Sequence, residues 1–208
     1  MRATATWPWQ REPRKNYDAR EYNVPHEPQN TPSGPEMAEI DEAIELSEYR
    51  ATWPRVFAEE QGRICRALDI PGEDLEHTGS TAVPGLVAKP IVDLMLGVGR
   101  FPPDGEFLKR IELLGWEALG EAGVPGRLYF RMRGARQANL HVVLKSGTHW
   151  VNNLAFRDYL RKNANARERY ANAKHRAVAH GARTLLRYSA EKADFVHTLL
   201  KEALATQR

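Results

Sequence analysis

The chain has 208 residues, of which 42% are hydrophobic and 27% charged, and its formal net charge is +3. These values are typical of a folded globular domain and exclude a collagen-like, disulfide-rich or wholly disordered chain. The apolar run at residues 90–98 is too short to span a bilayer and contains Asp93, so a transmembrane protein is excluded as well. The single cysteine, Cys65, cannot form an internal disulfide. Together with the lack of an apolar leader segment, this favours a cytoplasmic protein without membrane contact.

Residues 1–37 differ in composition from the rest of the chain. They hold six of the thirteen prolines and show neither a helical nor a strand periodicity. Such a segment buries little apolar surface, so we predict a disordered or loosely docked N-terminal arm. Its tryptophans and tyrosines could anchor it on a surface or on a protein partner. Residues 38–208 form the predicted domain.

The first half of this domain alternates between helix and strand patterns. Thr52 and Pro54 begin a helix that ends before Pro71, since a Thr at the N-cap and a proline in the first turn are typical helix starts. A short strand is expected at residues 74–78, a buried strand at 91–98 and a helix at 109–114.

Two strands and a helical region complete the pattern. Apolar and polar residues alternate at 127–133 and at 139–145, which indicates two strands with one apolar face each. From Trp150 onward the period is helical, and three helices are expected, the last one after Ser189 as N-cap. The order predicts an α+β fold, with one mixed sheet flanked by helices and a C-terminal helical segment.

The C-terminal segment is the most basic part of the chain. Residues 150–208 carry 12 basic and 5 acidic side chains. Such a segment could face phosphate groups or simply present a solvated helical surface. Nucleic acid is disfavoured as a partner because no recognisable binding motif or interleaved exposed aromatic residues accompany the charge.

The stretch at residues 77–93 is the best candidate for a functional site. A strand leads into Gly79, Ser80 and Thr81, where the backbone can turn and hydroxyl and N–H groups can converge on an anion. Asp93 then interrupts a buried strand, and a buried carboxylate needs a hydrogen bond, an ion pair or a metal. No Walker A or dinucleotide-binding pattern is present.

Strand alternation suggests a partner for this carboxylate. Asp93 and Met95 share one face of their strand, as Asn139 and His141 do on theirs. If the two strands are neighbours, Asp93 and His141 meet. Such a pair could hold one metal ion, relay a proton or simply satisfy its own hydrogen bonds.

Several other side chains are candidates for contact with a ligand. Lys89 and Arg131 could meet phosphate oxygens, Lys as a point charge and Arg as a bidentate fork. His77 precedes the glycine turn and could orient a ligand or cap the loop. Arg157, in the run FRDYLR at residues 156–161, could reach substrate or attach its helix to the site loop.

The motif HTGSTAVPGLVAKPIVDL at residues 77–94 resembles the signature of the GrpB-like family, which belongs to the nucleotidyltransferase superfamily typified by DNA polymerase beta. The similarity extends to YRATWPRVFAEEQGRI at 49–64, LHVV at 140–143 and FRDYLR at 156–161. It covers roughly residues 45–205 and leaves the N-terminal arm unmatched.

The resemblance implies roles for some of these residues. In the superfamily a Gly-Ser pair holds nucleotide phosphates, and a D-x-[DE] pair with a third acid holds two divalent ions. Gly79 and Ser80 match the first motif and Asp93 matches the first acid, but Met95 replaces the second acid, and no third acid is evident near His141.

The implied function is therefore twofold. One expectation is a metal-assisted nucleotidyl transfer from a nucleoside triphosphate to an unknown acceptor, with Asp93 and His141 on the metal. The alternative is a non-catalytic nucleotide-binding or accessory domain, as in fusions with dephospho-CoA kinase. In both cases the expected ligand is a nucleotide or another phosphorylated small molecule, with a divalent metal.

Overall fold

The computed structural model describes residues 41–206, all of which belong to one compact unit. The predicted N-terminal arm, residues 1–37, lies outside the described residues. In the part that is described, no helix is both long and apolar enough to cross a membrane.

The centre of the fold is one open sheet. Its order is β1-β2-β5-β4-β3, with β2 and β5 parallel and the other neighbours antiparallel, so the sheet is mixed. The strands are β1 (Leu75–Thr78), β2 (Val92–Val98), β3 (Glu117–Ala118), β4 (Arg127–Met132) and β5 (Ala138–Leu144). The predicted α+β class is confirmed.

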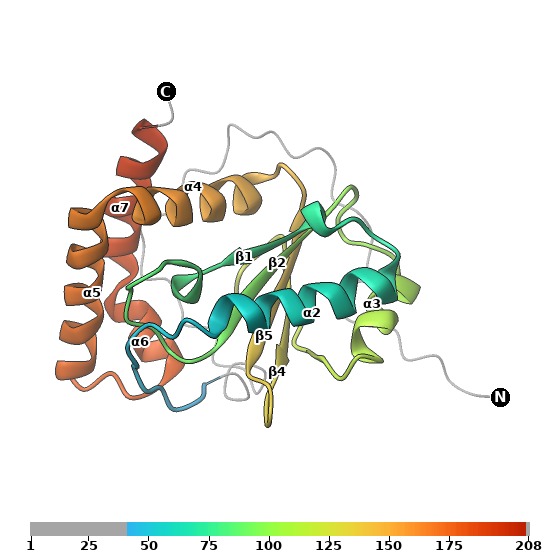
Figure 1. The fold of residues 1–208 in the computed structure, drawn as a ribbon, viewed down its shortest axis with the longest axis horizontal. Coiled ribbons are helices and arrows are strands. Elements are labelled where there is room, and N and C mark those ends of the chain that lie inside the picture. Colours follow the sequence, from blue (N-terminus) through green and yellow to red (C-terminus); the bar gives the residue numbers. More distant parts are fainter. Residues whose placement is uncertain (1–40, 207–208) are drawn as a thin grey trace. The chain divides into compact units, whose positions relative to one another are not determined.

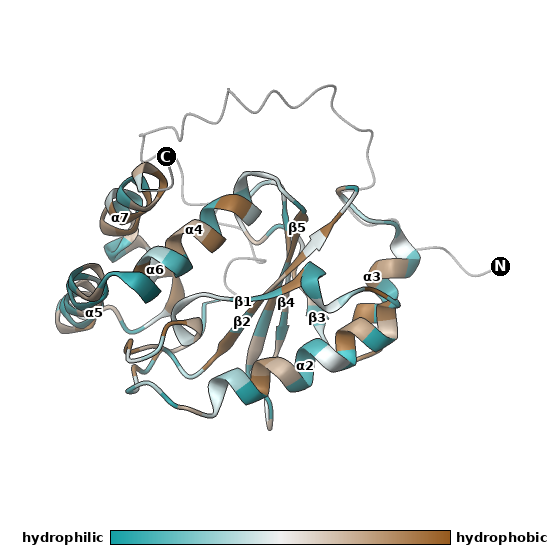
Figure 2. Ribbon diagram, turned by 45° about the horizontal axis from the view of Figure 1, so that its top comes forward, coloured by the Kyte–Doolittle hydropathy of each residue, from teal (hydrophilic) through white to brown (hydrophobic). Residues whose placement is uncertain are grey.

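Helices cover both faces of this sheet, as Figures 1 and 2 show. One face carries α2 (Trp53–Leu68) and α3 (Gly105–Glu112), and the other carries α4 (Thr148–Lys162). Beside α4 stand the remaining helices, drawn in orange and red in Figure 1: α5 (Ala164–Ala179), α6 (Leu185–Glu191) and α7 (Ala193–Ala205).

The C-terminal region corrects one expectation. Four helices follow β5 in the described residues, where three were expected, and Ser189 lies inside α6 instead of capping the last helix. The reason is Tyr188, which is buried against Ala177 and Ala182 and so brings the turn before Ser189 into a helix of its own. Lys192 then separates α6 from α7 with φ −106° and ψ 0°.

Strand alternation decides which side chains face which helix layer. Met95 and Val143 pack against Trp150 of α4, so the face that holds Asp93 is the α4 face. His77 stacks on Phe57 of α2 and therefore points to the opposite face.

The loop between β1 and β2 is anchored to the C-terminal helices. Its Val83 and Leu86 are fully buried in a cluster with Leu160, Tyr170 and Leu199. Each such aliphatic side chain contributes roughly 1.5–3 kcal/mol when removed from water. This packing holds the glycine-rich part of the loop against α4 and α5.

Candidate functional site

A cavity of about 390 Å³ opens on the α4 side of the sheet, where the β1–β2 loop meets the C-terminal helices. Its size is within the range of small-molecule sites. The polar side chains that line it come from the loop, from four strands and from the C-terminal region. They are Thr78, Ser80, Thr81, Lys89, Asp93, Arg127, Tyr129, Asn139, His141, Asn153, Tyr170, Lys174, Tyr188, Ser189 and Lys192.

Gly79 brings the loop backbone into contact with Asp93. Its φ is +66°, in the region that favours glycine, and a Cβ built there would lie 2.3 Å from Asp93 Oδ2. No other residue type fits this approach without displacing the carboxylate. Glycine at this position therefore allows the β1–β2 loop to pack closely against β2.

Asp93 is held by two side chains of β5. Asn139 Nδ2 donates to Asp93 Oδ1 at 2.7 Å, and His141 Nε2 lies 3.6 Å from the same oxygen. The predicted meeting of Asp93 and His141 on one face is confirmed. Burial alone would raise the pKa of Asp93, but hydrogen bonding, from His141 foremost, and the charge of Lys89 outweigh it and lower the pKa. The carboxylate is thus ionised at neutral pH.

His141 is neutral at the same pH. Burial lowers its pKa, and Arg127 adds to this effect while Asp93 opposes it. Its Nδ1 lies 3.5 Å from Arg127 Nη1, which leaves Nε2 to carry the proton toward Asp93. Both separations exceed a good hydrogen bond, so the imidazole retains capacity for a ligand.

Two lysines at the cavity have ammonium groups without a polar partner. Within residues 41–206, the Nζ atoms of Lys89 and Lys192 form neither a hydrogen bond nor an ion pair, although Lys192 Nζ lies 4.9 Å from the centre of the Tyr188 ring. Burial lowers the pKa of both lysines, and Asp93 opposes this effect. An anion placed between them would favour their charged forms.

Arg127 adds a buried donor. Its Nε is buried and has no hydrogen-bond partner in the described part of the chain, whereas Nη2 donates to the carbonyls of Glu121 and Ala122. A buried N–H without a partner costs roughly 1–3 kcal/mol unless water or a ligand satisfies it. Asp93 is the one carboxylate among the described residues that line the cavity, so the lining is cationic.

Lys174 also faces the cavity but is fully engaged. Its Nζ lies 2.7 Å from Ser80 Oγ and 2.6 Å from the carbonyl oxygen of Val87. It therefore joins α5 to both ends of the β1–β2 loop.

His77 does not line this cavity, and its predicted contact with a ligand stays a prediction. On the α2 face it stacks on Phe57 with 4.9 Å between ring centres, and its Nε2 lies 3.0 Å from Thr81 Oγ1. Burial lowers its pKa to about 4, so it is neutral. The open alternative, a cap of the loop, describes it better.

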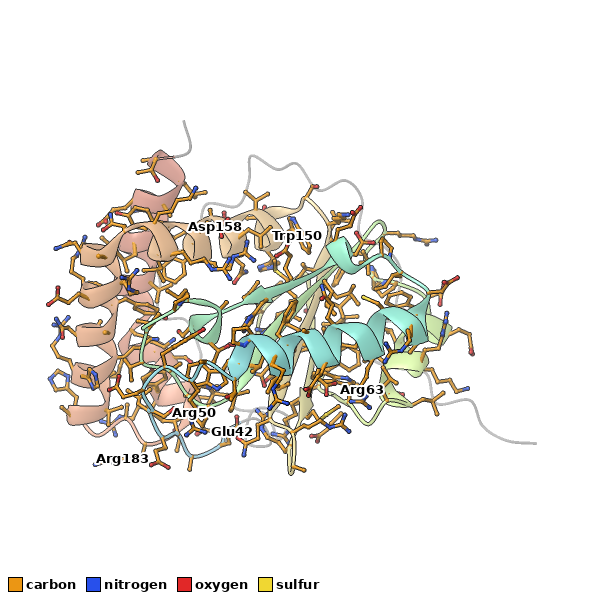
Figure 3. All side chains as sticks on the ribbon, in the orientation of Figure 1. Glu42, Arg50, Arg63, Trp150, Asp158 and Arg183 are labelled. Atoms are coloured by element: carbon orange, nitrogen blue, oxygen red, sulfur yellow. The ribbon has the colours of Figure 1, made fainter. Side chains whose placement is uncertain are left out.

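Arg157 is also a structural residue and does not line the cavity. Its Nη1 donates to Glu76 at 2.6 Å and to the carbonyl of His77 at 3.0 Å, and its Nε donates to Asp158, which Figure 3 labels on α4. These contacts attach α4 to β1, directly before the site loop. Arg161 attaches α4 to the loop itself, because its Nε donates to the carbonyl of Ala82 at 2.8 Å.

Arg131 points to the edge of the sheet. Its Nε donates to Glu117 of β3 at 2.6 Å, and it is absent from the cavity lining. The six remaining predicted residues do line the cavity: Gly79, Ser80, Thr81, Lys89, Asp93 and His141.

Sequence reasoning assigned no ligand contact to Arg127, Lys174 or Lys192. One signal was available for Lys174. It follows Ala166 and Tyr170 on the buried stripe of α5, at a position where an apolar residue is the rule. A lysine on such a stripe must reach a polar partner.

The side chains present do not fit a two-metal centre. Met95, at the position of the second acid, is 1% exposed and packed against Val143 and Trp150. Nowhere in the described residues do three or more His, Cys, Asp or Glu side chains form a group that could hold a metal ion. Asp93 and His141 are the available donors, and the metal stays a prediction.

Comparison with known proteins identifies the family of this chain. A family model described as GrpB protein matches residues 43–202. The chain is 34% identical to the UPF0157 protein BH1888 of Halalkalibacterium halodurans, over 82% of this chain and 88% of that protein. It is 29% identical to the glutamate-rich protein GrpB of Alkalihalophilus pseudofirmus, over 76% of this chain and 94% of that protein.

A solved structure agrees with the sequence relatives. The crystal structure of the conserved protein GrpB from Enterococcus faecalis superposes with a TM-score of 0.67 at 33% identity. The match covers 78% of this chain and 99% of that one. The fold described above, a mixed sheet with a helical C-terminal region, is thus shared with a solved relative.

Proposed function

The chain belongs to the GrpB family, and we propose that its cavity binds the phosphate group of a nucleotide or of another phosphorylated small molecule. The observation that carries the proposal is the charge of the lining. Lys89, Lys192 and Arg127 oppose the single carboxylate of Asp93. A pocket of this kind favours an anion with several acceptor oxygens.

The donors are also free to bind. The Nζ atoms of Lys89 and Lys192 and the Nε of Arg127 have no hydrogen-bond partner within residues 41–206. Phosphate oxygens would satisfy the two ammonium groups, and charge-assisted bonds of this type are about twice as strong as neutral ones. The buried Nε of Arg127 adds its positive charge from behind the cavity wall. Ser80, from the Gly-Ser pair that the family resemblance links to phosphates, supplies a hydroxyl at the same cavity.

Binding without two-metal turnover is the better supported form of this function. The nucleotidyltransferase resemblance favours a nucleotide, but Met95 belongs to the core and cannot serve as the second acid. This agrees with an accessory, nucleotide-binding role.

Metal-assisted nucleotidyl transfer is the second candidate, and the Asp93–His141 pair favours it. One carboxylate and one imidazole, 3.6 Å apart, supply only part of a coordination shell. A divalent ion held there would depend on the phosphate oxygens of the ligand for further bonds, and would therefore enter with the ligand.

Thermal shift and calorimetry test the proposal. Inorganic phosphate, AMP and ATP are added to the full-length chain in EDTA and, separately, with magnesium, manganese or zinc. We expect phosphorylated ligands to raise the melting temperature in EDTA, because a ligand of the native state stabilises it by mass action. Lys89→Met and Lys192→Met should each weaken binding about tenfold, which corresponds to about 1.4 kcal/mol.

Lys162→Met is the matched control, since Lys162 is exposed near the end of α4 and does not line the cavity. It should bind like the wild type. Equal affinity in all three lysine variants would contradict the proposal. Binding that requires a metal and disappears in Asp93→Asn would favour the second candidate instead.

A further inference from the structure

Ser80 and Lys174 form a close pair that phosphate binding leaves unexplained. Lys174 is 1% exposed and reaches from α5 to place its Nζ 2.7 Å from Ser80 Oγ. Ser80 is only partly buried and lines the cavity. A desolvated amine behind an accessible hydroxyl is the arrangement in which a base activates a nucleophile.

The burial of Lys174 favours the neutral form of its amine. Burial lowers its pKa well below the ordinary value of 10.5, and the charges of Lys192 and Lys89 lower it further, whereas Asp93 opposes them. A neutral amine can donate one N–H to the carbonyl of Val87, at 2.6 Å, and accept the Ser80 hydroxyl proton with its lone pair.

No other group described at Ser80 is as well suited to be the base. The phenol of Tyr170 lies next to Ser80, but burial raises its pKa to about 12, so it keeps its proton. Asp93 Oδ1 accepts from Asn139, and no hydrogen bond joins Asp93 to Ser80 in the described residues. Lys174 therefore combines a lowered pKa with hydrogen-bond distance to Ser80 Oγ.

We propose that Ser80 and Lys174 act as a nucleophile and its base toward the phosphoryl group of the bound ligand. The inference rests on the proposed function for the ligand, but its chemistry can be tested separately. Ser80 Oγ forms a bond to phosphorus, and its proton passes to Lys174 Nζ. The bond from phosphorus to the leaving oxygen breaks with its electron pair on that oxygen, which then takes the proton from Lys174. The products are phosphorylated Ser80 and the released alcohol or phosphate.

In this scheme, binding of the anion also makes Lys174 a better base. An anion between Lys89 and Lys192 offsets the two positive charges that act on Lys174. Lys174 then becomes a stronger base at the moment when the electrophile is present. The same lysines stabilise the charge on the phosphoryl oxygens during transfer.

The alternative is that Lys174 only attaches α5 to the loop. Labelling with diisopropyl fluorophosphate separates the two roles, because this uncharged reagent brings a phosphorus electrophile and releases fluoride. The full-length protein is incubated with the reagent, and the adduct is located by intact mass and peptide mapping. We expect one adduct, on Ser80, that is absent from Ser80→Ala.

Ser146→Gly is the control, because Ser146 is exposed, has φ +63°, which suits glycine, and does not line the cavity. It should be labelled like the wild type. Lys174→Arg introduces a cation that can bind the Val87 carbonyl but cannot act as a base near neutral pH, since arginine stays protonated. It should slow labelling by about 100-fold, the lower limit for general-base catalysis.

The pH dependence adds a readout that a structural attachment would not change. In the wild type the labelling rate should rise to a plateau with a midpoint below 10.5, the ordinary value for lysine, and Lys174→Met should lose this profile. Melting temperatures of all variants show whether they fold. Absence of a Ser80 adduct in the folded wild type, or full labelling of Lys174→Arg, would overturn the inference.

Inorganic phosphate distinguishes this inference from the proposed function. If phosphate slows Ser80 labelling, both the nucleophile pair and phosphate binding at the site are supported. If Ser80 is labelled at the same rate with phosphate present, the nucleophile pair stands and phosphate binding at the site fails. If phosphate stabilises the protein but Ser80 is never labelled, the nucleophile pair fails and phosphate binding stands.

Discussion

Gly79 is the residue where an added methyl group should do most harm to the site. In Gly79→Ala the new Cβ would lie 2.3 Å from Asp93 Oδ2, on a backbone with φ +66°. We expect a loss of about 3 kcal/mol in the free energy of unfolding, from the unfavourable φ and the displaced carboxylate together. Urea denaturation measures this loss.

Gly85→Ala is the control for the backbone term alone. Gly85 has φ +76°, but nothing lies within 4 Å of a Cβ built there. Its loss should be about 1–2 kcal/mol. Equal losses in the two variants would show that the close approach to Asp93 contributes nothing.

The pH dependence of stability should report the buried imidazole of His77. Burial lowers its pKa from 6.5 to about 4, so between these values the unfolded chain binds a proton that the folded chain does not. Stability from this residue is complete above the unfolded value and is lost as pH falls through the folded value. The loss amounts to about 3 kcal/mol, because one pKa unit corresponds to about 1.36 kcal/mol.

His77→Gln should be less stable at neutral pH but should show a flatter decline toward pH 4 when its free energy of unfolding is measured by denaturant. His175→Gln, at an exposed position of α5, keeps His77 and should decline like the wild type. Parallel curves for His77→Gln and wild type would contradict the prediction.

Part of the site could be predicted from the sequence because it depends on the alternation of side chains along single strands. Asp93 and His141 lie on adjacent strands, and the two-residue period of a strand tells which side chains share a face. His77 obeys the same period, and it pairs with Leu94 on the face opposite Asp93. Lys192 could not be found in this way, because its position depends on how α6 and α7 pack against the loop.

At the scale of elements, two arginines attach α4 to the rest of the fold: Arg157 binds β1, and Arg161 binds the loop that follows β1. Arg157→Met removes hydrogen bonds to Glu76 and to the His77 carbonyl, and it leaves the Glu76 carboxylate without its cation. We expect a loss of roughly 2–3 kcal/mol. Amide hydrogen exchange at residues 79–87 should become faster.

Arg55→Met serves as the control on a helix surface. Arg55 pairs with Glu59, four residues away, and both side chains are exposed. Such pairs contribute at most about 0.5 kcal/mol, so this variant should match the wild type in stability and in loop protection. Unchanged exchange in Arg157→Met would mean that the contact of Arg157 with β1 does not stabilise the loop.

The elements that were predicted well are those with a strong local pattern. The four longer strands were expected within about a residue of their observed ends, since alternation is a property of the strand itself. β3 has two residues, too few for any period. The division of the C-terminal region into α6 and α7 depends on burial of Tyr188, which is a tertiary effect.

At the scale of the whole molecule, the segment at residues 41–48 decides where a truncation is tolerated. Asp41 Oδ1 accepts from the backbone N–H of Leu186, and Glu42 pairs with Arg133 at 2.6 Å. The backbone N–H of Ile44 donates to the carbonyl of Arg183. Figure 3 labels Glu42 and Arg183.

Deletion of residues 1–37 spares all of these contacts and should leave the melting temperature unchanged, as the composition of that arm also predicts. Deletion of residues 1–48 removes them and should lower the melting temperature by several degrees, since a loss of about 1 kcal/mol shifts it by roughly 2–4 °C in a chain of this size. Calorimetry of both truncations tests this. A large loss in the shorter deletion would show that the arm contributes to the core.

The cavity is lined by residues from Thr78 to Lys192, so its walls come from distant parts of the chain. During synthesis Thr78 leaves the ribosome well before Lys192, so the strands can begin to fold before the last part of the cavity wall exists. The cavity therefore has no complete wall until Lys192 has been synthesised. A fragment that ended before α6 would contain the Gly-Ser loop and Asp93 but would lack Tyr188, Ser189 and Lys192, which line the same cavity.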